Sequence, residues 1–420
     1  MGFASTYLDT RTVFPTLIKE APDKQTGIIV VVPAYNEPGI TALLDSLKLC
    51  DEPDFNVEVI IVINAPVNAS LESQKNNRKS ISDIESWKKT NRDVFFRLFV
   101  IDTNTSSFNH WGVGLARKTG MDEAIRRFNG LEKPEGVILN LDADCLVEKN
   151  YFTSVCNELM KIKNRSACSI YFEHQLSGND FTEKLYKSII LYELHLRYYF
   201  QGLRYSGFPY AFYTIGSAIA VKALPYIKVG GMNRRQAGED FYFIQKLVPA
   251  GGYFSLNTTT IYPSPRTSLR VPFGTGSTIS KLMENGGKVF LTYNIQSFKE
   301  LHSFFGLTDK MYTCKPDELT ILYEELPEGV KLFVNEKEWT DKMLEIKTNT
   351  SGLVSFQKRF FGWFNMFKIV KYMNYVHSGF FKRNHVENSA NELLRIKGHN
   401  LDLKDSLSLL SLYRSLEKGS

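Results

Sequence analysis

The chain has 420 residues, of which 43% are hydrophobic and 23% are charged. This composition is typical of a folded protein with an ordinary core, so disorder of the whole chain is excluded. The 51 basic and 45 acidic side chains leave a net charge of +6, which permits an anionic ligand but does not indicate nucleic acid as a partner. The length predicts one large domain or two to three ordinary ones.

The first part of the chain alternates between β-branched runs and stretches with helical spacing of apolar residues. We expect strands at 27–33, 57–63, 94–101 and 137–141, and helices at 40–47, within 66–93 and at 114–128. Such alternation predicts an α/β fold with a parallel sheet and helices on both faces. Ligands of these sheets bind at the carboxyl ends of the strands, so residues that follow the strands are the first candidates for a site.

The pattern changes after residue 150. A long helix rich in aromatic residues is predicted at 181–203, with shorter strands near 218–221 and 253–256, and the segments after residue 300 are helical and charged. We therefore expect three regions: an N-terminal lead-in at 1–26, an α/β domain at 27–300 and a mainly helical C-terminal region at 301–420.

Cysteine usage predicts a reducing compartment. The five cysteines are odd in number, and none is spaced from another as in a metal finger or a CxxC motif. Residues 1–20 lack the apolar stretch of a signal peptide, and the longest uncharged windows contain Gly, Pro and many hydroxyl residues. We expect a cytoplasmic protein, with peripheral contact at the inner face of the membrane as an open alternative.

Two acidic residues follow the fourth predicted strand, in the order Asp142-Ala143-Asp144. Carboxylates at i and i+2 point the same way, and oxygen ligands of this kind suit Mg²⁺ or Mn²⁺, with phosphates completing the shell. A turn cap or a solvated pair would be the structural alternative. Their place at the ligand edge of the predicted sheet favours a metal site.

A second acidic pair, Glu239 and Asp240, opens an apolar helical stretch. Acidic residues are favoured at a helix start because of the helix dipole, so this pair has a purely structural explanation as well. Together with Asp142 and Asp144, the pair would supply the general base of a displacement reaction.

A third segment, 111–120, combines glycines with Arg117 and Lys118 ahead of a predicted helix. Glycines allow close backbone approach, and the two basic side chains can meet a phosphate. The spacing differs from that of a Walker loop, and close helix packing explains the glycines equally well.

Several motifs in the same order resemble family 2 glycosyltransferases, which have the GT-A fold, a Rossmann-like sheet with helices on both faces. The resemblance covers roughly residues 27–265 and is carried by these segments: Val30–Glu37, Gly114–Gly120 (similar to GxxxARNxG), Leu141–Asp144 (DxD), Gly216–Ala218, Gly230–Asn233 and Gly238–Asp240 (ED). It implies an enzyme that moves a sugar from a nucleotide-sugar donor to an acceptor hydroxyl, with inversion by single displacement. The acceptor would be a glycan or a lipid-linked molecule.

The resemblance also implies roles for individual residues. Asp142 and Asp144 would hold ribose, diphosphate and the cation, Mn²⁺ or Mg²⁺, and Asp240 would be the base. Glu239 would orient the site or cap the helix. The resemblance assigns the nucleotide to Pro33, Ala34, Tyr35 and Glu37. We also expect Asn64, Arg117 and Lys118 to bind the nucleotide sugar.

Two departures from the family pattern affect the donor site. The family often carries Asp-Asp-Gly-Ser after the second strand, where this chain has Asn64-Ala65-Pro66, so the nucleotide base is left open. Many members also have a histidine metal ligand about twenty-five residues beyond the ED motif. Here that stretch carries Arg266 and Arg270, which can hold the diphosphate through their planar guanidinium groups or form a salt-bridged loop.

Two aromatic stretches have alternative explanations. The aromatic residues between 198 and 213 would either stack on sugar rings or fill a core. Residues 356–383 mix basic and aromatic side chains, which suits either an anionic membrane surface or an amphipathic helix packed on the rest of the chain.

Two rival functions stay open at the level of sequence. One is a sugar-1-phosphate nucleotidyltransferase, although the loop after the first predicted strand lacks the expected GxGTRxxP pattern. The other is a non-catalytic binding protein on a transferase fold, against which the intact acidic pairs argue.

Overall fold

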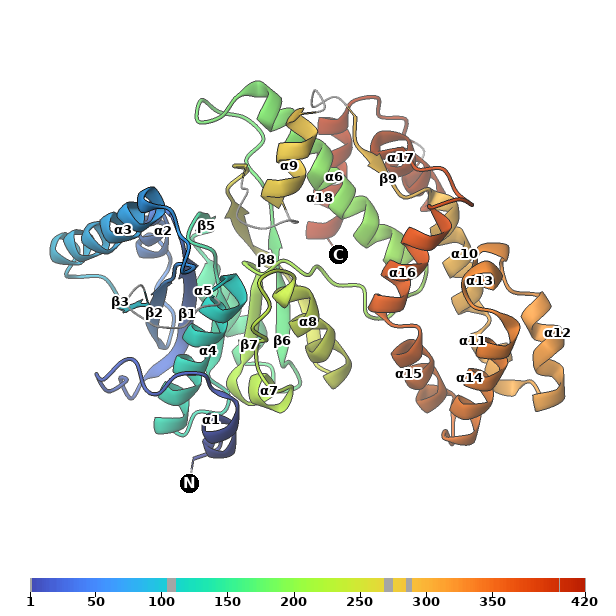
Figure 1. Cartoon of the computed structure of the whole chain (residues 1–420), viewed down its shortest axis with the longest axis horizontal. Helices are drawn as coiled ribbons and strands as arrows, with labels where there is room; N and C mark the ends of the chain where they lie inside the picture. Colours follow the sequence, from blue (N-terminus) through green and yellow to red (C-terminus); the bar gives the residue numbers. More distant parts are fainter. Residues whose placement is uncertain (1, 104–110, 268–274, 285–288, 400, 420) are drawn as a thin grey trace. The chain divides into compact units, whose positions relative to one another are not determined.

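The computed structural model describes residues 2–103, 111–267, 275–284, 289–399 and 401–419 (Figure 1). The chain forms two compact units. Unit 1 contains Met1–Gly178 and Phe212–Ser277, and unit 2 contains Asn179–Ala211 and Thr278–Gly419. Each unit is therefore built from chain segments that are separated in the sequence.

Unit 1 is an α/β structure. Its strands are β1 (Thr26–Ala34), β2 (Asn56–Ile63), β3 (Phe96–Asp102), β4 (Val137–Asn140), β5 (Cys145–Val147), β6 (Ala167–Phe172), β7 (Ile219–Lys222) and β8 (Tyr253–Pro263). Its helices are α1 (Ser5–Arg11), α2 (Ile40–Lys48), α3 (Leu71–Thr90), α4 (Val113–Gly130), α5 (Tyr151–Val155), the π-helical turn η1 (Cys156–Met160), α7 (Ala223–Lys228) and α8 (Glu239–Ala250).

The eight strands described in unit 1 form a single sheet in the order β3-β2-β1-β4-β7-β6-β8-β5. The first four strands in this order are parallel, as expected from the buried, β-branched runs of β1 and β2. The other half differs from the parallel sheet that we expected, because β7 runs antiparallel to both β4 and β6, and β5 runs antiparallel to β8. The sheet is therefore mixed, and the α/β class is confirmed.

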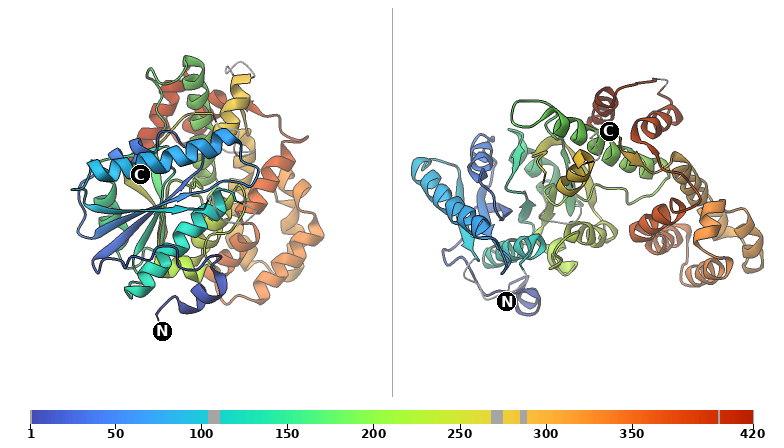
Figure 2. Two further views of the ribbon diagram at one scale, coloured as in Figure 1. Left: turned by 60° about the vertical axis from the view of Figure 1, so that its left-hand side comes forward. Right: turned by 45° about the horizontal axis from the view of Figure 1, so that its top comes forward.

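Helices cover both faces of the parallel half of the sheet (Figure 2). On one face, Val30 and other strand residues pack with Leu43 of α2 and with Ile84 and Trp87 of α3. On the other face, α4 packs against β1 and β2. Residues expected as a lead-in contribute α1, whose Tyr7 is buried and donates a hydrogen bond to Asp122 of α4 at 2.8 Å.

Unit 2 is mainly helical. Its elements are α6 (Glu183–Tyr205), α10 (Ile295–Gly306), α11 (Thr308–Thr313), the 3₁₀ turn η2 (Pro316–Glu318), α12 (Leu319–Glu324), α13 (Glu328–Phe333), α14 (Glu336–Thr348), α15 (Leu353–Trp363), α16 (Met366–Val376), α17 (Val386–Ile396), α18 (Ser406–Lys418) and the strands β9 (Leu291–Thr292) and β10 (Asn384–His385). The helix α9 (Thr275–Glu284) begins in unit 1 and continues into unit 2.

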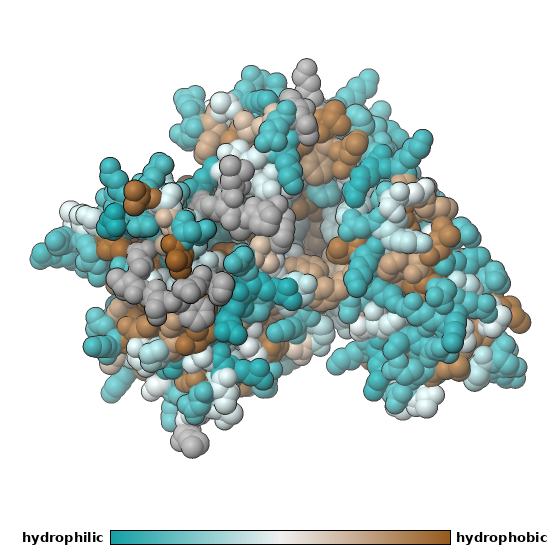
Figure 3. Space-filling view, viewed as in Figure 1, coloured by the Kyte–Doolittle hydropathy of each residue, from teal (hydrophilic) through white to brown (hydrophobic). Residues whose placement is uncertain are grey.

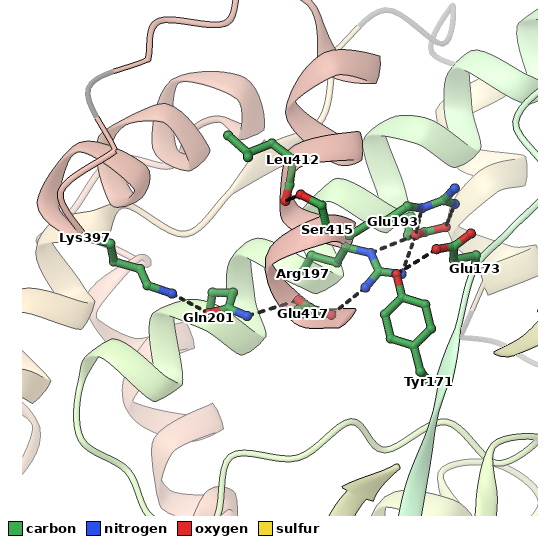
Figure 4. Close-up of polar contacts among 10 residues, drawn as sticks. Tyr171, Glu173, Glu193, Arg197, Gln201, Lys397, Leu412, Ser415 and Glu417 are labelled. Carbon is green, nitrogen blue, oxygen red and sulfur yellow. Dashed lines mark hydrogen bonds and ion pairs between the residues drawn. The ribbon is translucent and has the colours of Figure 1, made fainter. Parts of the chain in front are cut away.

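These units do not coincide with the boundary that we expected near residue 300. Helix α6 lies with the C-terminal helices because it packs on α10, α17 and α18. Four ionised side chains join α6 to α18, and the carboxylate–guanidinium distances are 2.8 Å for Glu193–Arg197, 2.5 Å for Glu417–Arg197 and 2.7 Å for Glu193–Arg414 (Figure 4). Local sequence patterns do not show such long-range pairing.

The aromatic residues of unit 2 mostly fill its interior. Tyr198 and Phe208 are buried, and Phe208 contacts the rings of Phe305 and Phe361. The aromatic face of α15 is buried as well. This burial agrees with the interpretation of residues 356–383 as an amphipathic segment packed on the rest of the chain. On the face seen in Figure 3, apolar side chains lie in separate small areas of a largely polar surface. In the part of the chain that the structure describes, no helix is long and apolar enough to cross a membrane.

The contact between α4 and the sheet depends on Gly120. A Cβ atom at this position would lie 2.4 Å from Cγ1 of Val31 and 3.1 Å from Cγ2 of Val62. We expect Gly120→Ala to lower the free energy of unfolding by about 1–3 kcal/mol, because the helix must move off the sheet. Denaturant unfolding followed by circular dichroism measures this change.

Gly130→Ala at the exposed end of the same helix is the matched control, since no atom lies within 4 Å of its added Cβ. It should leave stability unchanged or raise it slightly, because alanine favours the helix. Equal effects of the two substitutions would contradict the close packing at Gly120.

Candidate active site

The candidate residues gather at the carboxyl ends of β1 and β4, which are neighbours in the sheet. Pro33 and Ala34 are the last residues of β1 and are buried. The loop that follows carries Tyr35 and Glu37, and the Asp142–Asp144 turn follows β4 directly. The sheet therefore brings the first motif and the DxD motif together, as expected for a parallel pair of strands.

A buried arginine joins the DxD motif to the ED motif. Arg117 of α4 is 3% exposed, and its guanidinium nitrogens lie 2.5 Å from Oδ1 of Asp142 and 2.6 Å from Oε1 of Glu239. Gly216 leaves room for this group, because a Cβ there would lie 1.8 Å from Nη1 of Arg117. Segments that are separated by up to 122 positions in the chain are thus held by one side chain.

The charges of this group follow from its burial. Burial alone would lower the pKa of Arg117, but Asp142 and Glu239 outweigh this effect and raise it, so the guanidinium stays charged. Burial raises the pKa of Glu239 to about 7, although Arg117 acts in the opposite direction. Burial likewise raises the pKa of Asp240 above its usual range, again opposed by Arg117.

The ED motif lies at the start of α8, where we expected a helix. Gly238 precedes the helix with φ of 70°, a left-handed conformation that suits glycine. Asn233 of the Gly230–Asn233 motif supports the turn, since its Nδ2 donates to the carbonyl of Glu239 at 2.9 Å. The Glu239 carboxylate accepts a hydrogen bond from Arg117, whereas Asp240 accepts a hydrogen bond from the amide of Phe241 at 2.7 Å.

A second arginine binds the other aspartate of the DxD motif. Nε of Arg266 lies 2.7 Å from Oδ2 of Asp144, and Nη2 lies 2.6 Å from each carboxylate oxygen of Glu37. Arg266 is 24% exposed, so it is far more open to solvent than Arg117. Arg266 thus joins the site, as the sequence suggested, and Arg270 lies outside the described residues.

Lys118 has different surroundings from its neighbour Arg117. Its Nζ lies 2.9 Å from Oδ2 of Asp122 and 3.1 Å from the hydroxyl of Tyr7, in the buried contact between α1 and α4. The structure therefore gives Lys118 a packing partner, and the expectation that it binds the nucleotide stays a prediction.

Helix α3 holds the loop after β1 in place, a role that sequence analysis missed. The backbone amide of Asn64, after β2, donates to the carbonyl of Ala34 at 3.0 Å. The Asn77 side chain of α3 accepts a hydrogen bond from the amide of Asn36, after β1, at 2.8 Å. It also donates to the carbonyl of Asn64 at 3.0 Å. Asn77 and Ser80 are buried at helical spacing with Ile84. The signal in the sequence was the presence of these polar residues at positions where the spacing of a helix predicts a buried face.

The DxD carboxylates have the chemistry of a divalent-cation site. Oxygen ligands of this type suit Mg²⁺ and Mn²⁺, and the side chains of Asp142 and Asp144 are 37% and 27% exposed. No three His, Cys, Asp or Glu side chains converge as a metal site within the described ranges.

Residues 29–221 match the sequence family described as glycosyl transferase family 2. The matched segment includes the first motif, Arg117 and the DxD motif. This segment is therefore similar to a family 2 transferase domain, and the chain is a glycosyltransferase. No curated protein sequence is significantly similar to the chain.

Solved structures of several glycosyltransferases resemble the chain at low sequence identity. Residues 1–349 of S. aureus TarS in complex with UDP-GlcNAc are 15% identical, with 79% of this chain and 89% of that chain covered and a TM-score of 0.41. The mannosyltransferase PcManGT from Pyrobaculum calidifontis, in complex with GDP-Man and Mn²⁺, is 14% identical over 99% of this chain and 92% of that chain, with a TM-score of 0.37. Glucosyl-3-phosphoglycerate synthase from Mycobacterium tuberculosis is 14% identical over 55% and 70%, with a TM-score of 0.36.

The pairing of Arg117 with Glu239 predicts a pH-dependent stability. We expect Arg117→Met to lower the free energy of unfolding by about 3–5 kcal/mol at about pH 8, because it leaves buried carboxylates without a counter-charge. The loss should be smaller at about pH 5.5, where Glu239 is protonated. Urea denaturation at the two pH values measures both effects.

The sign follows from the raised pKa of Glu239. A carboxyl whose pKa rises from its ordinary value to about 7 on folding contributes stability at low pH, and this contribution is lost as the pH rises through about 7. Adding Glu239→Gln to Arg117→Met should therefore recover most of the loss at high pH. A loss that is the same at both pH values and in the double variant would contradict this assignment.

Proposed function

We propose that this glycosyltransferase transfers a sugar from a nucleotide-sugar donor to an acceptor hydroxyl, with inversion and with the help of Mn²⁺ or Mg²⁺. The observation that carries the proposal is the Arg117 bridge, because it places the DxD carboxylate Asp142 and the start of α8 around one guanidinium. A donor site and a base are thereby held beside each other at the ligand edge of the sheet.

The donor site is formed by residues after β1 and β4. We assign the nucleotide to Pro33, Ala34, Tyr35 and Asn64. The Asn64 amide donates to the Ala34 carbonyl, and Glu37 accepts a hydrogen bond from Arg266. Arg266 offers planar N–H donors of the kind that bind phosphate oxygens in pairs. A diphosphate that reaches this place would meet Arg266 and the DxD turn at once.

Asp142 and Asp144 would hold the divalent cation. A bound cation of this type neutralises the charge that develops on the departing diphosphate. The residues of the chain do the rest: they fix the donor, keep Arg117 charged between Asp142 and Glu239, and orient the base on α8.

Asp240 is the proposed base. The acceptor oxygen forms a bond to the anomeric carbon while the bond from that carbon to the phosphate oxygen breaks, and the acceptor proton passes to the Asp240 carboxylate. Burial raises the pKa of Asp240, which strengthens it as a base, and its bond from the Phe241 amide fixes its orientation. One base and one leaving group on opposite faces of the sugar give inversion.

The acceptor is proposed to be a glycan or a lipid-linked molecule, and a lipid-linked acceptor would bring peripheral contact with the inner face of the membrane. A cytoplasmic site of action is supported by the cysteines, since all five lie in the described residues and none forms a disulfide. The direct experiment is turnover of a panel of UDP- and GDP-sugars with Mn²⁺, with Mg²⁺ and with chelator. No sugar release or transfer from any donor would overturn the proposal.

Asp144 tests the cation assignment. We expect Asp144→Ala to abolish transfer and to weaken nucleotide binding in Mn²⁺, because a carboxylate ligand is lost, while the fold survives. Calorimetry of UDP and GDP binding with Mn²⁺ and with chelator measures the effect. Full activity in chelator, or in Asp144→Ala, would contradict a role for the metal.

Asp240 tests the base. We expect Asp240→Asn to keep nucleotide-sugar binding near the native level and to lower turnover by a factor of about a hundred or more, since the amide cannot accept the proton. Glu239→Gln is the neighbouring control and should affect binding or stability at least as much as turnover. If Asp240→Asn turns over normally, or loses donor affinity and turnover in equal measure, another group is the base.

A further inference from the structure

The two aspartates of the DxD motif are held by different kinds of ion pair. Asp142 pairs with Arg117, which is 3% exposed and is fixed on its other side by Glu239. Asp144 pairs with Arg266, which is 24% exposed and follows β8 in the 264–267 segment. The pair of Asp142 and Arg117 is therefore buried and fixed. The pair of Asp144 and Arg266 is open to exchange with ions from solvent.

Arg266 is held by Glu37 as well as by Asp144. Both carboxylate oxygens of Glu37 lie 2.6 Å from Nη2, and Nε donates to Oδ2 of Asp144 at 2.7 Å. The Glu37 side chain is also more deeply buried than that of Asp144. Loss of the Asp144 contact would therefore leave Arg266 anchored in the site.

A divalent cation on Asp144 competes with this guanidinium. Both need the same carboxylate, and like charges at such short range repel each other strongly in a partly buried place. A cation alone would leave the group of Arg266, Glu37 and Asp144 with excess positive charge. A diphosphate removes that excess and can accept the Nε–H bond that Asp144 gives up.

We propose that Arg266 is a displaceable counter-ion of Asp144, which makes binding of the divalent cation depend on a nucleoside diphosphate. Without nucleotide, Arg266 holds Asp144 and excludes the cation. With nucleotide, Arg266 stays on Glu37 and turns its free donor to a phosphate oxygen, and Asp144 passes to the cation. This inference rests on the proposed cation site and concerns how the site is filled.

The test is Mn²⁺ binding to the full-length chain without nucleotide, measured by electron paramagnetic resonance of free Mn²⁺. Loss of a charge-assisted contact of this kind changes a binding constant by about a factor of ten, so Arg266→Gln should bind Mn²⁺ about tenfold more tightly than the native chain. Adding Asp144→Asn to Arg266→Gln should abolish the gain, since the gained ion sits on Asp144.

Two further variants keep the result clear. Arg165→Gln is the matched control, because Arg165 forms a half-exposed ion pair with Glu158 and its loss changes the net charge equally; it should not change Mn²⁺ binding. If Arg266→Gln fails to fold, as judged by circular dichroism, Arg266→Lys is used instead. Lysine keeps the charge but lacks the planar fork of the guanidinium, so this variant should bind Mn²⁺ more tightly than the native chain, but by less than tenfold.

A second titration measures the coupling itself. Saturating UDP or GDP should tighten Mn²⁺ binding to the native chain much more than to Arg266→Gln, because in the variant the competitor is already gone. Unchanged Mn²⁺ affinity in the Arg266 variants, a gain that survives Asp144→Asn, or an equal gain in Arg165→Gln would overturn the inference.

These outcomes are separate from those of the proposed function, because no sugar or acceptor is present. A chain that transfers no sugar but shows the Arg266 effect would disprove the proposed reaction alone. A chain that transfers sugar with native-like Mn²⁺ binding in Arg266→Gln would disprove this inference alone.

Discussion

The site depends on one buried guanidinium. Arg117 has carboxylates on two sides, Asp142 and Glu239, which belong to segments far apart in the sequence. A buried charge is unfavourable unless it is paired, so the protein must bring these segments together in order to bury Arg117 at all. The missing side chain of Gly216 and the close packing of α4 on the sheet both serve this placement.

The DxD motif therefore combines a fixed and an exchangeable half. Asp142 cannot leave Arg117 without exposing a buried charge, whereas Asp144 is tied to a partly exposed arginine. This division suits a site that must keep its geometry between turnovers and yet accept and release a charged product.

Sequence patterns predicted those elements whose formation depends on neighbouring residues in the chain. The runs at 27–33 and 137–141 became β1 and β4, and the acidic pair at Glu239 opens α8 as expected. The antiparallel half of the sheet was not predictable, because the six residues of β6 are all buried and show no alternation that would set a direction. Nor could local patterns assign partners, which is why Lys118 was grouped with Arg117 although it packs on Asp122 and Tyr7.

The separated segments of unit 2 have a consequence for synthesis on the ribosome. Arg197 of α6 pairs with Glu417 of α18, a residue that follows it by 220 positions. Helix α6 therefore leaves the ribosome long before the α18 side chains that neutralise and cover it. Long-range contacts of this kind close slowly and leave apolar surface open to early aggregation.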